Sequence, residues 1–279
     1  MVRNLMKAGF ELHIYARTKS KVEDVIGEGA QFHESIKDCV QDCDAVITIV
    51  GFPQDVEEVY FDEGNILDSA KEGAYLIDMT TTSPQIAEKI YAEGTKRGFH
   101  VMDAPVTGGD TGAKAGTLSI LVGGEKEDYE ACMPLFEAMG TNINYQGKAG
   151  CGQHCKLANQ IMIAGTLSGV CEALTYAKEQ GLDPEVFMKS VATGAAGSKQ
   201  LDTFGPKILK DDYAPGFFMK HFIKDMKLAL IEANRKGLSL DVLSMVLANY
   251  EELEQEGYGD LGTQALMKFY DEEHRNTEE

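Results

Sequence analysis

Hydrophobic and polar positions follow different patterns in the two halves of this 279-residue chain. Up to about residue 150, short runs rich in β-branched and aromatic residues, typical of strands, alternate with amphipathic helical stretches. The expected strands span residues 11–15, 44–50, 74–78, 100–103, 118–122 and 142–145, and the expected helices include 19–27, 54–60 and 84–97. Strands that alternate with helices pair in parallel, so this half is predicted to be doubly wound α/β with a parallel sheet.

The strand pattern stops after residue 150. Residues 152–180 have a helical pattern without a proline, and at about 1.5 Å per residue this helix would be on the order of 40 Å long. Because it exceeds the width of a small domain, we expect it to link two domains or to form an oligomer interface. Further helices are expected at residues 184–192, 199–210, 218–236, 241–255 and 261–270. The sequence therefore predicts an α/β domain over 1–150 and an all-helical domain over 151–279.

Acidic residues outnumber basic residues by 45 to 26, which gives a formal net charge of −19. The field of such a chain repels nucleic acids and anionic membranes, so neither is expected as a partner. The opening residues lack the apolar stretch of a signal peptide, and the longest uncharged run is too short and too rich in Gly, Ser and Thr for a membrane span.

The six cysteines are scattered through the expected elements, which favours reduced thiols. We therefore expect a cytoplasmic protein. Cys151, His154 and Cys155 resemble part of a metal site, but no second pair of ligands follows at zinc spacing. The sequence predicts no metal centre.

Ligands of a doubly wound sheet bind at the carboxyl ends of its strands. After residues 11–15 the chain continues with Arg17, Thr18 and Lys21. At this place dinucleotide sites carry an acidic residue for the ribose 2'-hydroxyl or a basic residue for a 2'-phosphate. A guanidinium makes bidentate hydrogen bonds with phosphate, so these residues favour NADP over NAD. The alternative is a solvated turn that begins a helix.

Later strand ends also carry candidate residues. The glycine of "VGFP" (50–53) lets a ligand approach the backbone. Thr80, Thr81 and Thr82 lie beside a helix N-terminus, where their hydroxyls can bind a ribose or substrate, although capping the helix is the better interpretation for most of them. The glycines of residues 103–124, with Thr107, expose backbone N–H groups that can bind a carboxylate, or they simply connect two strands.

The segment "GCGQHCKLANQ" (150–160) places polar groups on an otherwise apolar helix. Residues three and four apart share a helix face, so Lys156, Asn159 and Gln160 are expected to form one patch. An ammonium group at the edge of a desolvated site can donate a proton to a developing alkoxide, because burial lowers the pKa of such a group. Alternatively, Lys156 extends to water from a buried helix and the amides are structural.

These segments together resemble the β-hydroxyacid dehydrogenase family, which includes 3-hydroxyisobutyrate dehydrogenase and the tartronate semialdehyde and glyoxylate reductases. The resemblance covers nearly the whole chain and is carried by "YARTKSK" (15–21), "VGFP" (50–53), "LIDMTTTSP" (76–84), "DAPVTGGDTGAKAGTL" (103–118), "GKAGCGQHCKLANQ" (147–160), "GAAGSKQL" (194–201) and "FIKDMKLAL" (222–230). It implies an NAD(P)-dependent interconversion of a short hydroxy acid and its semialdehyde. The first domain would bind the dinucleotide, and the second would serve substrate binding and dimerisation.

The resemblance also implies roles for individual residues. Lys156 would be the catalytic proton donor and acceptor, with Asn159 and Gln160 on its face. The carboxylate of a small substrate would bind at Thr107, Gly108 and Gly109. Residues that match cofactor contacts are Phe52, Pro53, Thr81 and Lys224, while Arg17 and Thr18 match the NADP-type members. A homodimer or homotetramer is expected.

The chain departs from the family pattern in three places. Ala16 stands where many members have asparagine, and Lys199 stands where many have an aromatic residue. The family's first strand and its G-x-G-x-x-G turn are missing, because Met1 already matches the helix that follows them. We expect the native start to lie upstream of Met1. A protein that truly begins at Met1 would fit a second function, a non-catalytic ligand-binding or assembly homologue that has lost cofactor binding.

Overall fold

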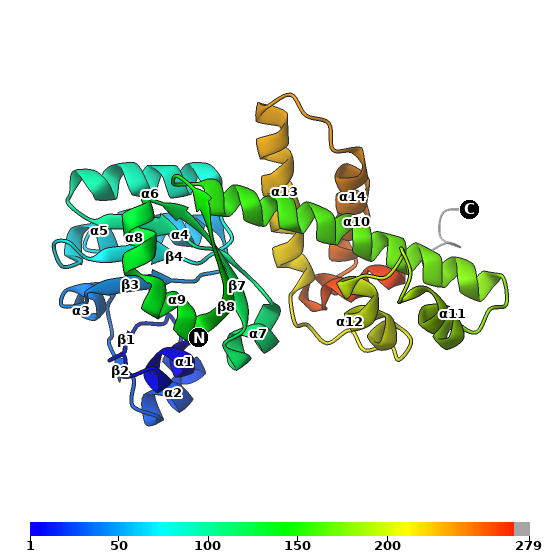
Figure 1. Ribbon diagram of the computed structural model, residues 1–279, viewed down its shortest axis with the longest axis horizontal. Coiled ribbons are helices and arrows are strands. Elements are labelled where there is room, and N and C mark those ends of the chain that lie inside the picture. Colours follow the sequence, from blue (N-terminus) through cyan, green and yellow to red (C-terminus); the bar gives the residue numbers. More distant parts are fainter. Residues whose placement is uncertain (271–279) are drawn as a thin grey trace. The chain divides into compact units, whose positions relative to one another are not determined.

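The computed structural model describes residues 1–270 and divides into two compact units, Met1–Lys156 and a second unit that starts at Leu157 (Figure 1). The first unit is an α/β fold whose six-stranded main sheet has the order β3-β4-β5-β7-β6, with β8 paired to β7. The strands of this sheet are β3 (Ala45–Thr48), β4 (Tyr75–Asp78), β5 (His100–Asp103), β6 (Val106–Thr107), β7 (Leu118–Gly124) and β8 (Gly140–Gly147). Two further strands, β1 (His13–Ile14) and β2 (Gln31–Phe32), form a separate parallel pair.

The helices of the first unit cover both faces of the main sheet (Figure 1). The helices of this unit are α1 (Val2–Lys7), α2 (Glu23–Gly27), α3 (Ile36–Val40), α4 (Pro53–Phe61), α5 (Ile66–Ser69), α6 (Pro84–Lys96), α7 (Gly109–Ala115), α8 (Lys126–Ala131) and α9 (Met133–Met139). Of these, α2 contributes to neither core cluster of the main sheet. The sequence predicted α2, α4 and α6. It missed α3, α5, α7, α8 and α9, which have four to seven residues each and are too short for a clear helical period.

The predicted α/β fold is confirmed, and all six predicted strands form, but the sheet is not wholly parallel. Strands β3, β4 and β5 are parallel, whereas β7 runs antiparallel to both β5 and β6. Only Ala104 and Pro105 separate β5 from β6, so no crossover fits between them. The chain instead reverses direction at α7 and returns as β7.

The strand register explains how two core clusters arise. Leu76 lies opposite Val101, and both pack with Val56, Val59 and Tyr60 of α4. The next pair in register, Ile77 and Met102, points to the other face and packs with residues of α9. Because successive side chains of a strand point to opposite faces, each parallel strand contributes to both clusters.

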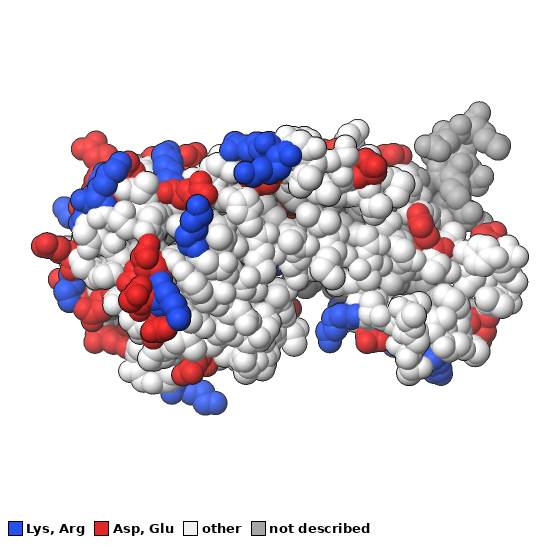
Figure 2. Space-filling view, turned by 45° about the horizontal axis from the view of Figure 1, so that its top comes forward, with Lys and Arg blue, Asp and Glu red and all other residues white. Residues whose placement is uncertain are grey.

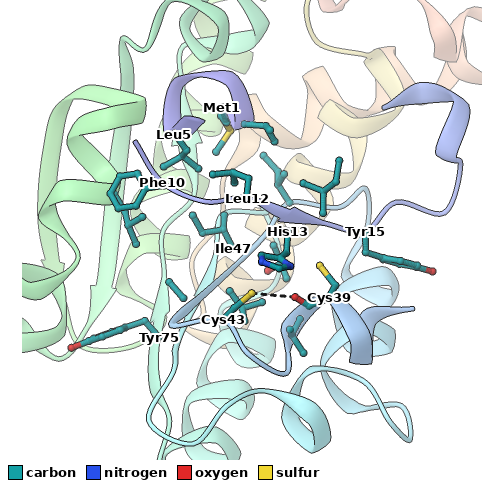
Figure 3. Close-up of a pocket in the computed structure, with 18 of the residues that line it drawn as sticks. Met1, Leu5, Phe10, Leu12, His13, Tyr15, Cys39, Cys43, Ile47 and Tyr75 are labelled. Atoms are coloured by element: carbon teal, nitrogen blue, oxygen red, sulfur yellow. Dashed lines mark hydrogen bonds between the residues drawn. The ribbon is translucent and has the colours of Figure 1, made fainter. Parts of the chain in front are cut away.

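A second departure concerns the first predicted strand. β1 pairs only with β2, and β3 pairs only with β4, among the strands of residues 1–270. Between β1 and β3 lies a cavity of about 700 Å³ with a mainly apolar lining, which includes Leu5, Leu12 and Ile47 (Figure 3). The pattern of residues 11–15 predicted a strand correctly, but it could not show that this strand stands apart from the main sheet.

The second unit is helical, as predicted. Its elements are α10 (Cys151–Glu179), which begins in the first unit, α11 (Pro184–Val191), α12 (Lys199–Ile208), α13 (Met219–Arg235), α14 (Asp241–Gln255) and two 3₁₀ segments, Tyr258–Asp260 and Thr263–Tyr270. The helix predicted over 261–270 is thus 3₁₀ rather than α. One core cluster fills the unit, with Phe222 and Tyr250 at edge-to-face geometry.

Helix α10 is long and apolar enough, by length and composition alone, to cross a membrane. Its buried residues Leu167, Cys171 and Leu174 belong to the core cluster of the second unit. This packing is what a core helix of a globular unit requires.

Basic and acidic side chains are interspersed over the surface of the first unit in Figure 2.

Candidate active site

The carboxyl ends of β4 and β5 carry two buried aspartates that lie opposite each other in the strand register, Asp78 and Asp103. The Asp103 carboxylate accepts hydrogen bonds from the backbone N–H groups of Gly150, at 2.7 Å, and Gln153, at 2.8 Å. It therefore holds the N-terminus of α10, where backbone N–H groups lack helical partners. Burial raises the pKa of Asp103.

The backbone conformation and close packing at the start of α10 require glycine at two positions. Gly150 has a φ of +85°, a conformation that favours glycine. A Cβ at Gly152 would lie 2.4 Å from the carbonyl oxygen of Leu121 and 2.7 Å from that of Asp103. The helix therefore begins in direct contact with the backbone of the sheet. Gly152 thus permits a close approach between the helix and these strands.

In the part of the chain that the structure describes, the hydrogen-bond partners of Asp78 are uncharged groups. Its Oδ1 accepts hydrogen bonds from the Thr48 hydroxyl at 2.9 Å and from the Thr80 backbone N–H at 3.1 Å. Within residues 1–270, its Oδ2 is buried without a hydrogen-bond partner. Burial raises the pKa of Asp78 to about 6.

The threonine segment after β4 does not cap α6 in the way the sequence favoured. The cap is Ser83, whose hydroxyl accepts a hydrogen bond from the Gln85 backbone N–H. The Thr80 hydroxyl instead accepts from the Val50 backbone N–H at 3.0 Å, and the Thr82 hydroxyl is buried without a partner in the described part of the chain. The prediction that most of these threonines cap the helix was wrong, because Ser83 already occupies that position.

Lys156 is buried, with 7% of its surface exposed. The interpretation in which this side chain extends into water therefore does not describe it. Asn159 and Gln160 follow on the same helix, three and four residues later, and the Asn159 amide donates to Gln160 Oε1 at 2.8 Å. The predicted polar face of α10 is thus a bonded pair of amides next to a buried lysine.

An aspartate of α13 that sequence reasoning missed bonds to this polar face of α10. Gln160 Nε2 donates to Asp225 Oδ2 at 2.7 Å, and Lys224 Nζ lies 3.0 Å from Asp225 Oδ1. Asp225 is fully buried. The signal was present in "KDM" (224–226), where only the lysine was singled out, because the role of its neighbour depends on a contact with a residue 65 positions away.

The predicted carboxylate-binding turn comprises the end of β6 and the start of α7. Gly108 and Gly109 have φ values of +130° and +64°, so both positions favour glycine. Thr107 is the last residue of β6. The structure brings these three residues together, and their binding of a carboxylate stays a prediction.

Of the residues expected at the cofactor, Arg17 lies beside the start of α4. Its guanidinium donates to Asp55 Oδ1 and to Glu58 Oε2, both at 2.7 Å. Phe52 and Pro53 are the N-cap and first residue of this helix, so the structure brings Arg17 close to them. Thr18 precedes a 3₁₀ turn that contains Lys21 (Lys19–Lys21). Arginine, threonine and lysine donors fit a phosphate group, but Arg17 already has two carboxylate partners.

The cavity of Figure 3 is not the place of this chemistry. Phe10, Leu12, Ile47 and Tyr75 are among its lining residues, and Cys43 donates to the Cys39 carbonyl at one side (Figure 3). An apolar slot between two strand edges does not suit an anionic dinucleotide. It is suited to apolar side chains.

No group of three or more His, Cys, Asp or Glu side chains suited to a metal ion occurs in residues 1–270. Burial raises the pKa of the Cys155 thiol, which disfavours the thiolate that metal ions require.

Comparison with protein families gives two matches that together span almost the whole chain. Residues 1–147 match the NAD-binding domain of 6-phosphogluconate dehydrogenase. Residues 150–270 match the NAD-binding domain of NADP-dependent 3-hydroxyisobutyrate dehydrogenase.

Individual relatives agree with these matches. The uncharacterized oxidoreductase YkwC of Bacillus subtilis is 48% identical over 97% of this chain and 94% of its own. The probable 3-hydroxyisobutyrate dehydrogenase-like 1 protein of Arabidopsis thaliana, described as mitochondrial, is 44% identical over 96% of this chain and 80% of its own. The structure of Mycobacterium tuberculosis 3-hydroxyisobutyrate dehydrogenase with L-serine superposes with a TM-score of 0.88 at 26% identity, covering 96% of this chain and 93% of that one.

Proposed function

Because the chain belongs to the NAD(P)-dependent β-hydroxyacid dehydrogenase family, we propose that it interconverts a short β-hydroxy acid and its semialdehyde, with NADP as the preferred cofactor. The candidate substrates are of the 3-hydroxyisobutyrate, tartronate semialdehyde and glyoxylate type. L-serine is added to them, since the similar M. tuberculosis structure names it and it also carries a hydroxyl β to a carboxylate.

The observation that carries this proposal is the burial of Lys156 next to the Asn159–Gln160 pair. An ammonium group away from bulk water can transfer a proton to or from the substrate oxygen. The Gln160 amide is held by Asp225, so it can keep Asn159 in place for the same substrate oxygen. When bound, the nicotinamide supplies or accepts the hydride.

Other residues would bind and orient the reactants. The backbone N–H groups of Gly108 and Gly109, with Thr107, are suited to hold the substrate carboxylate. Arg17, Thr18 and Lys21 would hold the 2'-phosphate, and Phe52, Pro53, Thr81 and Lys224 would contact the cofactor. The NADP preference rests on Arg17, which must give up part of its bonding to Asp55 and Glu58 to bind a phosphate.

A lysine pair tests the proposal. Lys156→Ala should lower kcat by about 10²–10⁴-fold with the best substrate, while the NADPH dissociation constant changes little. Lys148→Ala, an exposed lysine shortly before the same helix, should keep the wild-type constants. The assay would screen 3-hydroxyisobutyrate, serine and glyoxylate with both nicotinamide cofactors. Substantial turnover by Lys156→Ala would count against the proton-transfer role.

A further inference from the structure

Gln153, in the first turn of α10, was not among the residues that the sequence singled out. Its side chain is fully buried, and both halves of its amide are used. A buried amide whose side-chain bonds all go to one short loop restrains that loop more than a buried apolar residue does, since each bond fixes a distance and a direction.

The loop that Gln153 holds is the threonine segment after β4. Gln153 Nε2 donates to the Thr80 carbonyl oxygen at 2.8 Å, and Gln153 Oε1 accepts from the Thr82 backbone N–H at 3.0 Å. The two bonds lie on either side of Thr81. The amide group supplies both the donor for the first bond and the acceptor for the second.

The same turn of α10 is held from the sheet. The Gln153 backbone N–H donates to Asp103 at the end of β5. Lys156 follows three residues later, on the same side of the helix. Through Gln153, the backbone around Thr81 and the helical turn that carries Lys156 thus form one hydrogen-bonded assembly within the first unit.

We propose that Gln153 is a positioning residue, which fixes the loop around Thr81 relative to Lys156 so that the cofactor contact and the proton-transfer group keep a constant separation. The inference rests on the proposed function for the roles of Thr81 and Lys156. Its physical basis is that a misplacement of about 1 Å can cost about 100-fold in rate.

The test compares two buried glutamines. Gln153→Met keeps most of the side-chain volume and removes the amide. Gln264→Met is the matched control, because Gln264 is also fully buried and donates to the carbonyls of Asp212 and Ala214 in the second unit. Both variants should lose thermal stability. Only Gln153→Met should raise the KM for NADPH and lower kcat, by about 10- to 100-fold in kcat/KM.

Two further measurements keep the test independent of folding defects. Gln153→Glu retains the acceptor for Thr82, and its protonated form can also donate to Thr80, so its activity relative to wild type should recover as the pH falls. Titration with NADPH should show that the losses of affinity caused by Gln153→Met and Thr81→Ala are less than additive in the double variant, since both act through one loop.

The outcomes separate the two proposals. If the wild type turns over no short hydroxy acid, the proposed function fails, while the NADPH titrations still show whether Gln153 and Thr81 are coupled. If the wild type is active but Gln153→Met loses only thermal stability, as Gln264→Met does, Gln153 is merely structural and the inference is overturned. Additive losses in the double variant would overturn it as well.

Discussion

The interiors of the two units differ in the partners of a buried carboxylate and in how completely they are packed. In the second unit, Asp225 is fully buried but has a cation, Lys224, and an amide, Gln160, as partners, and one core cluster surrounds them. In the first unit, the hydrogen-bond partners of Asp78 within residues 1–270 are uncharged hydroxyl and backbone N–H groups, and a cavity of about 700 Å³ separates β1 from β3. Buried charge is costly unless it is compensated, so the two interiors should respond differently to change.

The two units therefore differ in how many of their buried places are already filled or bonded. In the second unit, the buried carboxylate has both a cationic and an amide partner. The first unit has an apolar slot at a strand edge. It also has a buried carboxylate oxygen at a strand end that lacks a hydrogen-bond partner among residues 1–270. Such places are where an α/β unit gains stability by binding a strand or a ligand.

The largest effect is expected from filling the slot. An apolar strand followed by a glycine turn, joined ahead of Met1, should pair with the edges of β1 and β3 and raise the melting temperature. Each large side chain buried in the slot contributes about 1.5–3 kcal/mol. An extension of equal length built from glycine and serine is the control. Equal melting temperatures for the two extensions would show that the slot does not bind a strand.

Asp225 should be the most sensitive carboxylate of the second unit. Asp225→Ala leaves Lys224 without this carboxylate and Gln160 without its acceptor, so it should reduce the free energy of unfolding by about 3–5 kcal/mol. Chemical denaturation measures the loss. Asp260→Ala, which breaks the exposed pair of Lys220 on the same helix, should cost about 1 kcal/mol or less. A cost of Asp225→Ala as small as that of the exposed pair would remove the contrast between the units.

The carboxylate of the first unit predicts a pH dependence. An aspartate has a pKa of 3.8 in the unfolded chain, and burial raises the pKa of Asp78 to about 6 in the folded unit. The neutral form favours folding, so its contribution to stability is fully present below pH 3.8 and is lost as the pH rises through about 6. At about 1.4 kcal/mol per pH unit, this loss amounts to roughly 3 kcal/mol.

Asp78→Asn stays neutral at every pH. The melting temperature of this variant minus that of the wild type should therefore increase between about pH 4 and pH 7. Asp110→Asn provides the opposite control, because its ion pair with Lys114 lowers the pKa of Asp110. A difference for Asp78→Asn that does not change with pH would mean that this carboxyl is not the group that titrates.

The sequence predicted what depends on neighbouring residues and missed what depends on distant ones. Helix α6 was expected over residues 84–97, and it begins at Pro84. The polar face of α10 followed from spacing alone. The isolation of β1, by contrast, depends on which strands pair. The side-chain bonds of Gln153 and the bond between Gln160 and Asp225 join residues that are 65 to 73 positions apart. A buried glutamine on a helix has no local pattern that separates it from an exposed one.

For Arg17, the role predicted from its neighbours, binding a 2'-phosphate, competes with its ion pairs to Asp55 and Glu58. The smallest effects are expected at this residue. If Arg17 binds the 2'-phosphate, Arg17→Ala should weaken NADPH by about 1–2 kcal/mol, or roughly five- to thirtyfold, and leave NADH unchanged. Glu58→Gln removes one partner of the guanidinium, so it should strengthen NADPH binding, but only by a few-fold, since exposed ion pairs are worth about 1 kcal/mol or less. Titrations at low and high salt would show the NADPH effect shrinking as the charges are screened. If both variants changed NADPH and NADH affinity equally, Arg17 would be a structural partner of α4 and not a phosphate ligand. Its ion pairs with Asp55 and Glu58 would then have a structural role, like the buried pair of Lys224 and Asp225 in the second unit.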